Sequence, residues 1–556
     1  MSGIPIYEAL ARAFQAEGVD THFTLMGDAN MHWATAMQNL PGMKTFSVRH
    51  EHNAVGMAMG YHSATGKVGV ASVTCGPGFT QLMTILTTAV RARVPLVIFA
   101  GEAPVKAKWY SQAIDQQPFA AACGAHYITG HCPERMHQYV REAFYIAQHR
   151  RIPVVLGIPY DMQKLPMPDV GPYEPSSTLL PPVTRIQPEP GQISRLADKL
   201  AAARVPIIIA GRGVLQADAR AEVEDLADET GAMLANTLLA RGIYDHHPFS
   251  MGVAGGFARA VTCEVFAKAD LVVAIGASMS YHTVSGGKLI NPAAEVVQID
   301  AAPDGFRDGG RVANDYIRAD AKLSAIALLE ALRGRKTNAA IRSDELARRI
   351  RTEPADPTEY PAEEGVIDPR HVAHELEGIL PGDYDVISGN GHQSYFHTVM
   401  RGGDPTRYHV MRDFGAVGNA LSYTLGVAAA RGNGRVVLFE GDGGLLMHIQ
   451  ELETARRHGL KFLVVASNDG AYGSEIHKLR AEGIDDSGAI FGRTDLAAIA
   501  RGFGLRGATV TEAGRFQELL KAYEAGDQAE IWDVHVSDKV VNPRVREGTK
   551  LGHGVR

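Results

Sequence analysis

The sequence lacks several features that would place it in a special class of protein. Its four cysteines, Cys75, Cys123, Cys132 and Cys263, form no CxxC pair. We therefore expect free thiols in a reducing cytoplasm rather than a zinc site or a disulfide framework. No apolar run approaches the ~18 residues that a membrane-spanning helix needs. The N-terminal stretch has the pattern of an amphipathic helix and not that of a signal peptide.

Basic patches are missing as well. The 55 lysines and arginines are outnumbered by 62 aspartates and glutamates, which gives a formal net charge of −7. No run of basic residues is interleaved with aromatic residues, which argues against a nucleic-acid-binding protein. We therefore expect a cytoplasmic protein whose partner is a small molecule, and neither nucleic acid nor membrane.

The composition that remains is that of an ordinary globular protein, in a chain too long for one hydrophobic core. Hydrophobic residues make up 45% of the 556 residues and charged residues 21%. Two proline-rich stretches, 159–190 and 351–369, have the character of linkers, because proline fixes φ and removes a hydrogen-bond donor. We therefore predict three domains, over residues 1–165, 190–350 and 368–556.

Each predicted domain alternates short apolar runs, many of which end in glycine, with helical patterns. Continuous apolar runs of this kind are typical of parallel strands that are covered on both faces. We therefore predict an α/β fold with three doubly wound parallel sheets, in which ligands bind at the carboxyl ends of the strands. The expected strands are Val68–Cys75, Val94–Gly101, Val205–Gly213, Asp270–Ser278, Ala294–Asp300, Tyr384–Asn390, Arg435–Gly443 and Leu460–Asp469.

Two successive strands in the third domain each deliver a carboxylate to this edge. Asp442 follows one apolar run and Asp469 the next, with a single helical pattern, from Leu445 to Gly459, between them. One βαβ unit brings such strand ends together. Glycines beside Asp442 let backbone N–H groups approach an anion, and carboxylate oxygens suit Mg²⁺ or Ca²⁺. A tight turn with an aspartate cap is the alternative.

The segment "GDGGLLMHIQELETARRHGLKFLVVASNDGAYG" resembles the signature of thiamine diphosphate enzymes, which runs from Gly-Asp-Gly to an Asn-Asn pair. Asp469 departs from that pattern, because the family usually has asparagine there, and it adds one negative charge at the metal. The resemblance implies that Mg²⁺ is bound by Asp442, Asp469 and the backbone carbonyl of Ala471. It also implies cofactor contacts at Gly441, Gly443, Gly444 and Tyr472.

Three further segments carry the same resemblance. Within "FSVRHEHNAVGMAMGYHSATGKVGVASVTCGPG", Glu51 matches the glutamate that activates the pyrimidine ring. In "RDFGAVGNALSYTLGVAAA", Gly415 matches the carbonyl that accepts the amino group of the ring, and Val417 the apolar wedge under the bent cofactor. The segment "ISGNGHQS" resembles the diphosphate-side loop. Its candidate cofactor-binding residues are Asn390, Gly391, His392 and Gln393.

The resemblance also has an implication for the oligomeric state. In these enzymes the activating glutamate serves the cofactor that is held by the partner subunit. The resemblance therefore implies a homodimer at least, and we expect a homotetramer with the cofactor at a subunit interface.

Residues on the substrate side point to more than one reaction. Asp28 in "TLMGDANMHWATAM" and Glu475 in "NDGAYGSEIHKL" match proton-transferring carboxylates of pyruvate and indolepyruvate decarboxylases. Gln112 stands where those decarboxylases have a histidine pair, and a glutamine there is similar to acetohydroxyacid synthase and benzaldehyde lyase. His477 is a further catalytic candidate.

We therefore predict a lyase or carboligase, dependent on thiamine diphosphate and Mg²⁺, that acts on a 2-oxo acid or a 2-hydroxy ketone. The central domain lacks the arginine-rich segment of acetohydroxyacid synthase after its strand, so we expect no bound FAD. Two alternatives stay open: an FAD-containing acetolactate synthase and a non-catalytic protein that binds thiamine diphosphate.

Overall fold

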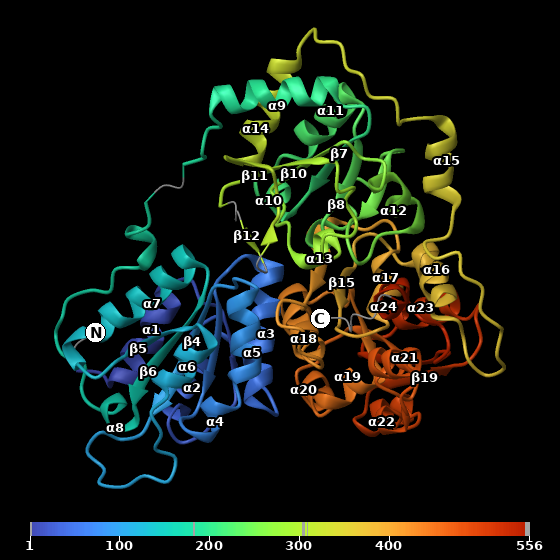
Figure 1. The fold of residues 1–556 in the computed structure, drawn as a ribbon. Helices are drawn as coiled ribbons and strands as arrows, with labels where there is room; N and C mark the ends of the chain where they lie inside the picture. Colours follow the sequence, from blue (N-terminus) through green and yellow to red (C-terminus); the bar gives the residue numbers. More distant parts are fainter. Residues whose placement is uncertain (1–2, 182–183, 303–305, 308–309, 551–556) are drawn as a thin grey trace.

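The computed structural model describes residues 3–181, 184–302, 306–307 and 310–550, and it places them in three lobes (Figure 1). Each lobe is built around one six-stranded sheet. Every pair of neighbouring strands in these three sheets is parallel. The predicted α/β fold with three doubly wound parallel sheets is therefore confirmed. Each sheet lies inside one of the predicted domain ranges, whose ends remain predictions.

The first lobe, blue to cyan in Figure 1, carries helices on both faces of its sheet. Its strands, in spatial order, are β2 (Lys44–Ser47), β1 (Thr21–Thr24), β3 (Gly69–Val73), β4 (Leu96–Glu102), β6 (Pro153–Pro159) and β5 (His126–Thr129). Its helices are α1 (Ile6–Ala16), α2 (Met31–Gln38), α3 (Glu51–Thr65), α4 (Pro77–Thr80), α5 (Met83–Arg91), α6 (Gln117–Cys123), α7 (Met136–Arg150) and α8 (Tyr160–Gln163).

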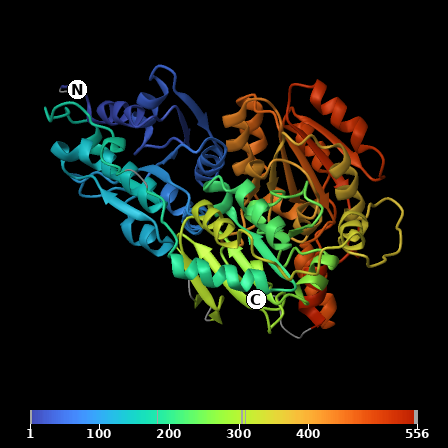
Figure 2. The ribbon, with the colours of Figure 1, turned by 90° about the horizontal axis from the view of Figure 1, so that it is seen from above.

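The central lobe, green to yellow, lies against both of the others (Figures 1 and 2). Its strands, in spatial order, are β14 (Asp315–Arg318), β11 (Glu295–Asp300), β10 (Leu271–Ile275), β7 (Pro206–Ala210), β8 (Met233–Asn236) and β9 (Ser250–Val253). A small antiparallel pair, β12 (Phe306–Arg307) and β13 (Gly310–Arg311), stands apart. Its helices are α9 (Pro190–Ala202), α10 (Arg212–Gln216), α11 (Arg220–Thr230), α12 (Ala260–Phe266), α13 (Tyr281–Val284), α14 (Ala321–Leu332) and α15 (Asp344–Thr352).

The third lobe, orange to red, ends the chain. Its strands, in spatial order, are β16 (Tyr408–Val410), β15 (Asp385–Ser388), β17 (Val436–Gly441), β18 (Leu463–Asn468), β20 (Glu530–His535) and β19 (Arg506–Val510). Its helices are α16 (Pro369–Ile379), α17 (Ser394–Thr398), α18 (Ala420–Arg431), α19 (Asp442–Met447), α20 (Glu451–Arg457), α21 (Gly473–Glu482), α22 (Leu496–Gly502), α23 (Phe516–Ala525) and α24 (Pro543–Lys550).

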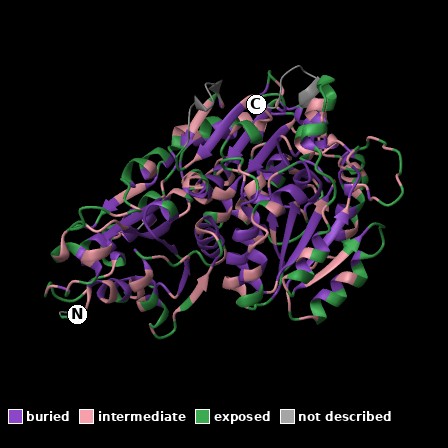
Figure 3. Ribbon diagram, turned by 90° about the horizontal axis from the view of Figure 1, so that it is seen from below, coloured by how far each residue is buried: buried purple, intermediate pink, exposed green. Residues whose placement is uncertain are grey.

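All eight apolar runs that the sequence marks as strands are strands in the structure, and all occupy interior positions of their sheets. Figure 3 shows these central strands buried on both faces by helices. Two local predictions were wrong. The single helix expected between Asp442 and Asp469 is two short helices, α19 and α20. The first proline-rich stretch is not wholly a linker, because it begins at the last residue of β6 and contains α8.

The first and third lobes share one strand topology and pack directly on each other. Their sheets have equivalent orders, β2-β1-β3-β4-β6-β5 and β16-β15-β17-β18-β20-β19. The equivalent helices α3 and α18, each following its edge strand, make the contact. A Cβ atom at Gly60 would lie 2.1 Å from the carbonyl oxygen of Tyr423, and one at Gly426 would lie 2.0 Å from that of Met57. Only glycine permits this close approach of the two backbones.

A buried charge cluster stabilises the third sheet, and we expect it to be essential for folding. The Asp385 carboxylate is fully buried and accepts hydrogen bonds from Arg407, His409 and Arg431 at 2.8–2.9 Å. Replacing Asp385 by asparagine is expected to lower the free energy of unfolding by about 3–5 kcal/mol, because it leaves buried cations without their partner. Urea denaturation at pH 7 measures this. The matched control is Asp383→Asn, which removes an exposed pair with Arg435 and should change stability by less than about 1 kcal/mol.

The same cluster predicts a dependence on pH. Burial alone would raise the pKa of Asp385, but hydrogen bonds from His409 and Arg431 outweigh it, and the pKa is lowered. Its contribution is therefore present above the unfolded pKa of about 3.9 and is lost as the pH falls through the folded value. The stability difference between the wild type and Asp385→Asn should shrink below about pH 4. Equal effects of Asp385→Asn and Asp383→Asn at pH 7 would contradict this assignment.

Within the described part of the chain, no helix combines the length and the apolar composition that crossing a bilayer requires.

Candidate functional site

A cavity of about 1000 Å³ opens at the carboxyl edge of the third sheet. It is lined by the loops that follow β15, β16, β17 and β18, together with central-lobe and C-terminal residues. Most of the cofactor and metal candidates gather here. Those that line it are Asn390, Gly391, His392, Gln393, Gly415, Val417, Gly441, Asp442, Gly443, Gly444, Asp469, Ala471 and Tyr472.

The two aspartates stand at the ends of neighbouring strands. β17 and β18 pair in parallel with Gly441 opposite Ser467, so Asp442 and Asp469 leave the sheet side by side. Asp442 accepts backbone hydrogen bonds from Gly443 and Gly470, each at 2.9 Å. Burial raises its pKa to about 6, and burial together with the charge of Asp442 raises that of Asp469 to about 7. Neither carboxylate has a basic partner among the ion pairs of the described residues, so a bound cation would offset the repulsion between them.

A glycine surface adjoins the aspartates. A Cβ atom at Gly444 would lie 2.7 Å from an oxygen of Glu440, and one at Gly443 would lie 2.9 Å from the ring of Tyr472. Side chains are thus excluded at the start of α19, so an anion can approach the backbone there, beside the Gly443 N–H that donates to Asp442. The exposed ring of Tyr472 packs edge-on against Phe491, with the ring centroids 5.2 Å apart.

The donor set fits Mg²⁺ shared with a diphosphate. In the described ranges, no group of three or more His, Cys, Asp or Glu side chains could hold a metal ion alone. Mg²⁺ keeps octahedral coordination and is commonly held by one or two carboxylates plus phosphate oxygens and water. Asp442 and Asp469, with the carbonyl of Ala471 beside them, supply the protein's share of such a set.

Because Asp469 departs from the family pattern, it leads to a testable prediction about the metal-free protein. Asp469→Asn removes one of two adjacent buried carboxylates while its side-chain oxygen can still accept from Ala471, as Asp469 Oδ1 does at 3.1 Å. We expect the free energy of unfolding of the metal-free protein at pH 8 to rise by about 1–2 kcal/mol. Affinity for Mg²⁺ with thiamine diphosphate should stay within about tenfold. Chemical denaturation and calorimetric titration measure the two quantities.

The matched control is Asp442→Asn, which makes the same change in charge. Both oxygens of Asp442 accept backbone N–H groups, so an amide nitrogen there would face a donor. This variant should lose stability and cofactor affinity. A metal-free Asp469→Asn protein that is less stable than the wild type would contradict the prediction.

The loop after β16 is fixed by Asn390. The Asn390 side chain donates to the carbonyl oxygens of Met411 and Ala416, at 3.0 and 2.8 Å. This leaves Gly415, with φ of +73°, and the exposed side chain of Val417 on the cavity wall. Asn390 thus positions the loop through its side chain. The placement of Val417 suits an apolar wedge under a bent ligand.

Glu440, which is not among the predicted site residues, lies directly beneath the glycines. It is buried, and one carboxylate oxygen accepts from the Gly441 amide at 3.0 Å and from Gln393 at 3.2 Å. Its other oxygen has no partner among the described residues. Burial raises the pKa of Glu440 to about 8. The available signal was its position directly before Gly441-Asp442-Gly443, in a strand otherwise made of apolar residues.

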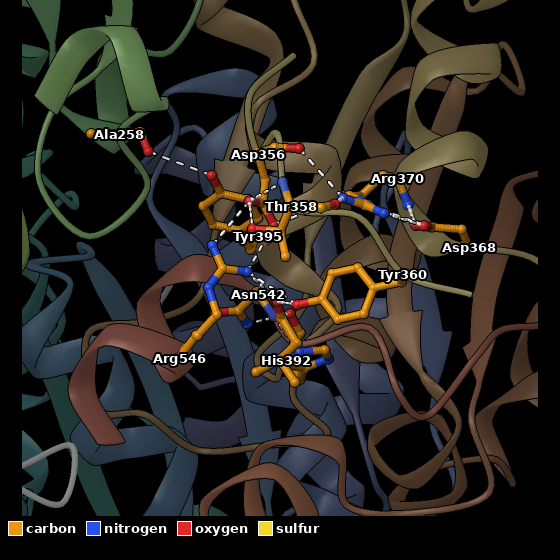
Figure 4. Close-up of polar contacts among 11 residues, drawn as sticks. Ala258, Asp356, Thr358, Tyr360, Asp368, Arg370, His392, Tyr395, Asn542 and Arg546 are labelled. Carbon is orange, nitrogen blue, oxygen red and sulfur yellow. Dashed lines mark hydrogen bonds and ion pairs between the residues drawn. The ribbon is translucent and has the colours of Figure 1, made fainter. Parts of the chain in front are cut away.

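The C-terminal segment is tied to the diphosphate-side loop. The Asn542 amide donates to the ring nitrogen Nε2 of His392 at 2.9 Å, and the Asn542 side chain donates to the His392 carbonyl at 3.1 Å. Further along, Arg546 donates two hydrogen bonds to the buried Asp356, at 2.9 and 3.1 Å. Figure 4 shows these contacts converging between the second proline-rich stretch and α24. The His392 ring therefore holds the C-terminal segment over the cavity.

Helix α21 directs two of the catalytic candidates to different places. Glu475 lines the cavity, and the side chain of Glu475 is 56% exposed. His477 is buried, does not line the cavity, and packs on His392 with ring centroids 4.3 Å apart. Positions two apart on a helix point about 200° away from each other, so both cannot face one cavity. The placement of His477 therefore does not support a catalytic role.

The remaining catalytic candidates gather in the first lobe, at the carboxyl edge of its own sheet. Glu51 begins α3, and Asp28 follows β1. The Cys75 thiol donates to the side-chain oxygen Oε1 of Gln112 at 3.6 Å. Burial, with nearby Cys75 and Asp28, raises the pKa of Tyr110 to about 12, which places Asp28 beside this group. The structure thus brings Glu51, Asp28 and Gln112 to one edge.

Within one chain, this first-lobe edge is not part of the large cavity, since no first-lobe residue lines it. Both regions expose large apolar side chains. Around the first-lobe edge these are Met26, Val105, Trp109 and Ile114, with Trp109 80% exposed. Around the cavity they are Phe414, Val417, Met447, Tyr472, Ile484, Ile490 and Phe491.

Comparisons with known proteins agree with this division into three parts. Family models match residues 5–119 as a thiamine pyrophosphate enzyme N-terminal TPP binding domain, 193–332 as its central domain and 389–533 as its C-terminal TPP binding domain. The chain is 29% identical to the acetolactate synthase large subunit of Parasynechococcus marenigrum, over 95% of this chain and 87% of that protein.

Two other relatives have similar names. An acetolactate synthase of Arthrospira platensis is 27% identical over 98% of this chain and 92% of that protein. The acetolactate synthase isozyme 3 large subunit of Escherichia coli is 29% identical over 83% of this chain and 82% of that protein.

Proposed function

Because the chain belongs to the thiamine pyrophosphate enzyme family, we propose that it is a lyase or carboligase, dependent on thiamine diphosphate and Mg²⁺, acting on a 2-oxo acid or a 2-hydroxy ketone. The single observation that carries this proposal is the pair of buried carboxylates, Asp442 and Asp469, beside the open glycine backbone of α19. A cation bound to a diphosphate satisfies both features at once.

The residues that would hold the cofactor follow from the geometry. Asp442, Asp469 and the carbonyl of Ala471 would bind Mg²⁺, with the backbone of Gly443 and Gly444 at the diphosphate. The exposed side chain of Val417 and the carbonyl of Gly415 would contact the rings. When bound, thiamine diphosphate supplies a nucleophilic carbon that adds to a carbonyl group, which side chains alone do not provide.

The chain's own part in the reaction is to orient the substrate and to move protons. Decarboxylation of a 2-oxo acid needs one proton to replace each CO₂ that leaves. Glu475 lines the cavity and its carboxyl group can deliver that proton. The side-chain oxygen of Gln112 already accepts a hydrogen bond from the Cys75 thiol. The side-chain N–H group of Gln112 can therefore donate to a substrate carbonyl. Asp28 lies near Tyr110 and Cys75.

We further propose that the active enzyme is a homodimer at least, and a homotetramer as the full assembly. Glu51, Asp28 and Gln112 of one chain would complete the cavity of another. Exposed apolar side chains around both regions support this, because large exposed apolar patches commonly mark protein interfaces.

The test is a substrate panel. Purified protein with Mg²⁺ and thiamine diphosphate is given 2-oxo acids and 2-hydroxy ketones, and CO₂ and products are measured together. One aldehyde per CO₂ indicates a decarboxylase, and one acetohydroxyacid per CO₂, or one acyloin per two CO₂, indicates a carboligase. Cleavage of a 2-hydroxy ketone without CO₂ indicates a lyase. Turnover of none of them would contradict the proposal.

The names of the relatives favour a second candidate, an acetolactate-forming synthase. It predicts one acetolactate per CO₂ from two pyruvate molecules. If FAD is part of that enzyme, the purified protein should also be yellow, and the flavin should be released on denaturation.

A further inference from the structure

Three side chains from distant parts of the sequence meet on the cavity wall that faces the central lobe. Arg412 comes from the loop after β16, Arg544 from α24, and Phe257 from the loop after β9, and all three line the cavity. The guanidinium carbon of Arg412 lies 4.5 Å from the centroid of the Phe257 ring, and that of Arg544 lies 5.7 Å from it. Two positive charges thus share one aromatic ring.

Arg412 forms no ion pair among the described residues, although the charge of the buried Glu440 acts on it. Its nitrogens Nε and Nη2 are buried and have no hydrogen-bond partner, and the described residues hold no carboxylate within ion-pair distance of it. Burial lowers the pKa of Arg412 to about 10, so it stays charged at neutral pH. A buried guanidinium without an ion-pair partner is costly. The site is therefore incomplete until an anion enters it.

Arg544 is held so that it faces the same place. Its Nη2 lies 3.3 Å from Nδ1 of His282. Its side chain lies over Gly256, where a Cβ atom would come 3.2 Å from its Cδ. Packing against the central lobe thus fixes the second guanidinium beside the first.

Arg412 and the two aspartates belong to loops at different strand ends of the third sheet. Asp442 and Asp469 stand at the ends of β17 and β18, whereas Arg412 follows β16, with β15 between β16 and β17. Neighbouring strands are about 4.8 Å apart, so β16 and β17 are separated by roughly 10 Å. Arg412 lies in the loop that leads from β16 to Gly415, and Arg544 lies on α24. An anion bound there belongs to the substrate rather than to the cofactor.

We propose that Arg412 and Arg544, gathered on Phe257, bind a second anionic group of the substrate, remote from the carbonyl that reacts. This inference rests on the proposed function, since it assumes a 2-oxo acid or a related carbonyl compound. Guanidinium groups pair with carboxylates and phosphates through two parallel hydrogen bonds. The substrate class is therefore a 2-oxo acid with an additional acid group, and a dicarboxylic 2-oxo acid is the simplest case.

The kinetic test compares substrates of equal length. The probes are 2-oxoglutarate, 2-oxopentanoate, which has a methyl group in place of the remote carboxylate, and 2-oxo-4-phosphonobutanoate. We expect the wild type to prefer an acid-bearing probe by at least about tenfold in kcat/KM. The preferred acid identifies the group as carboxylate or phosphonate. Arg412→Met should lower kcat/KM for that probe about 100-fold, mainly through KM, and change that for 2-oxopentanoate less than threefold.

A binding test requires no turnover. Glutarate and pentanoate are titrated calorimetrically into the protein loaded with Mg²⁺ and thiamine diphosphate. Glutarate should bind more tightly, and both Arg412→Met and Arg544→Met should abolish the difference. If Arg412→Met fails to fold, Arg544→Met alone provides the test. The matched control is Arg515→Met, which removes an exposed arginine paired with Glu518 and should leave the difference intact.

The outcomes separate this inference from the proposed function. Arginine-dependent glutarate binding without turnover of any 2-oxo acid would remove the proposed function and keep the anion site. Turnover of 2-oxo acids with no preference for the remote acid, in kinetics or in binding, would overturn the anion site. A loss of thiamine diphosphate affinity in Arg412→Met would also overturn it, because Arg412 would then serve the cofactor.

Discussion

Replacing Glu51 by glutamine is expected to lower turnover by about 10²–10⁴-fold while the protein keeps its fold and its Mg²⁺ and thiamine diphosphate. Glutamine has the shape of glutamate but cannot exchange a proton. No hydrogen bond to the Glu51 carboxylate is found among the described residues. It lies beside the tight turn at Gly78, where an added Cβ atom would come 3.3 Å from one carboxylate oxygen of Glu51. The Glu51 carboxylate therefore contributes little to the stability of the fold. A role in the reaction is the reason to expect a carboxyl group at this position.

Three measurements are needed to interpret the effect of Glu51→Gln. Turnover is measured with the best substrate of the panel, cofactor affinity by calorimetry, and the free energy of unfolding by urea denaturation. The control is Glu345→Gln, on an exposed side chain that pairs with Arg348 and should leave all three unchanged. Unchanged turnover in Glu51→Gln would remove Glu51 from the mechanism. A loss of cofactor affinity with normal kcat at saturation would reassign it to binding.

The fold could be predicted largely because its central strands carry a strong signal. Strands such as β3 and β7 are buried along their length, so their residues form continuous apolar runs. Edge strands carry a weaker signal, as β2 shows with Lys44, Thr45, Phe46 and Ser47 all at least partly exposed. The metal-binding candidates could be predicted from the sequence for the same reason. Asp442 and Asp469 directly follow two such central strands, and parallel pairing then requires that they meet.

What the sequence could not supply is contact between segments that no local pattern connects. Phe257, Arg412 and Arg544 come from different loops and helices and meet only when the central lobe and α24 pack on the third sheet. His477 shows a second limit. A motif match gives a position along the chain, whereas helix geometry decides the direction of the side chain, and the start of α21 at Gly473 turns His477 toward His392.

The division of site residues between two regions of one chain leads to the last prediction. Glu51→Gln and Asp442→Ala should each be inactive alone, the first for lack of the proton exchange and the second for lack of the metal. Coexpressed, they should regain about one quarter of wild-type activity. In a randomly assembled symmetric oligomer, half of the cavities have an intact Asp442, and half of these receive an intact Glu51 from a neighbour.

We expect exchange between chains rather than completion within one. Packing of α3 against α18 fixes how the first and third lobes of one chain meet, and in that arrangement no first-lobe residue lines the cavity. The double variant, with both changes in one chain, coexpressed with wild type is the control for assembly. It should also give about one quarter intact sites, formed between wild-type chains alone. Activity in that control without recovery from the two single variants would mean that each chain completes its own cavity, and that α3 and α18 separate for it to do so.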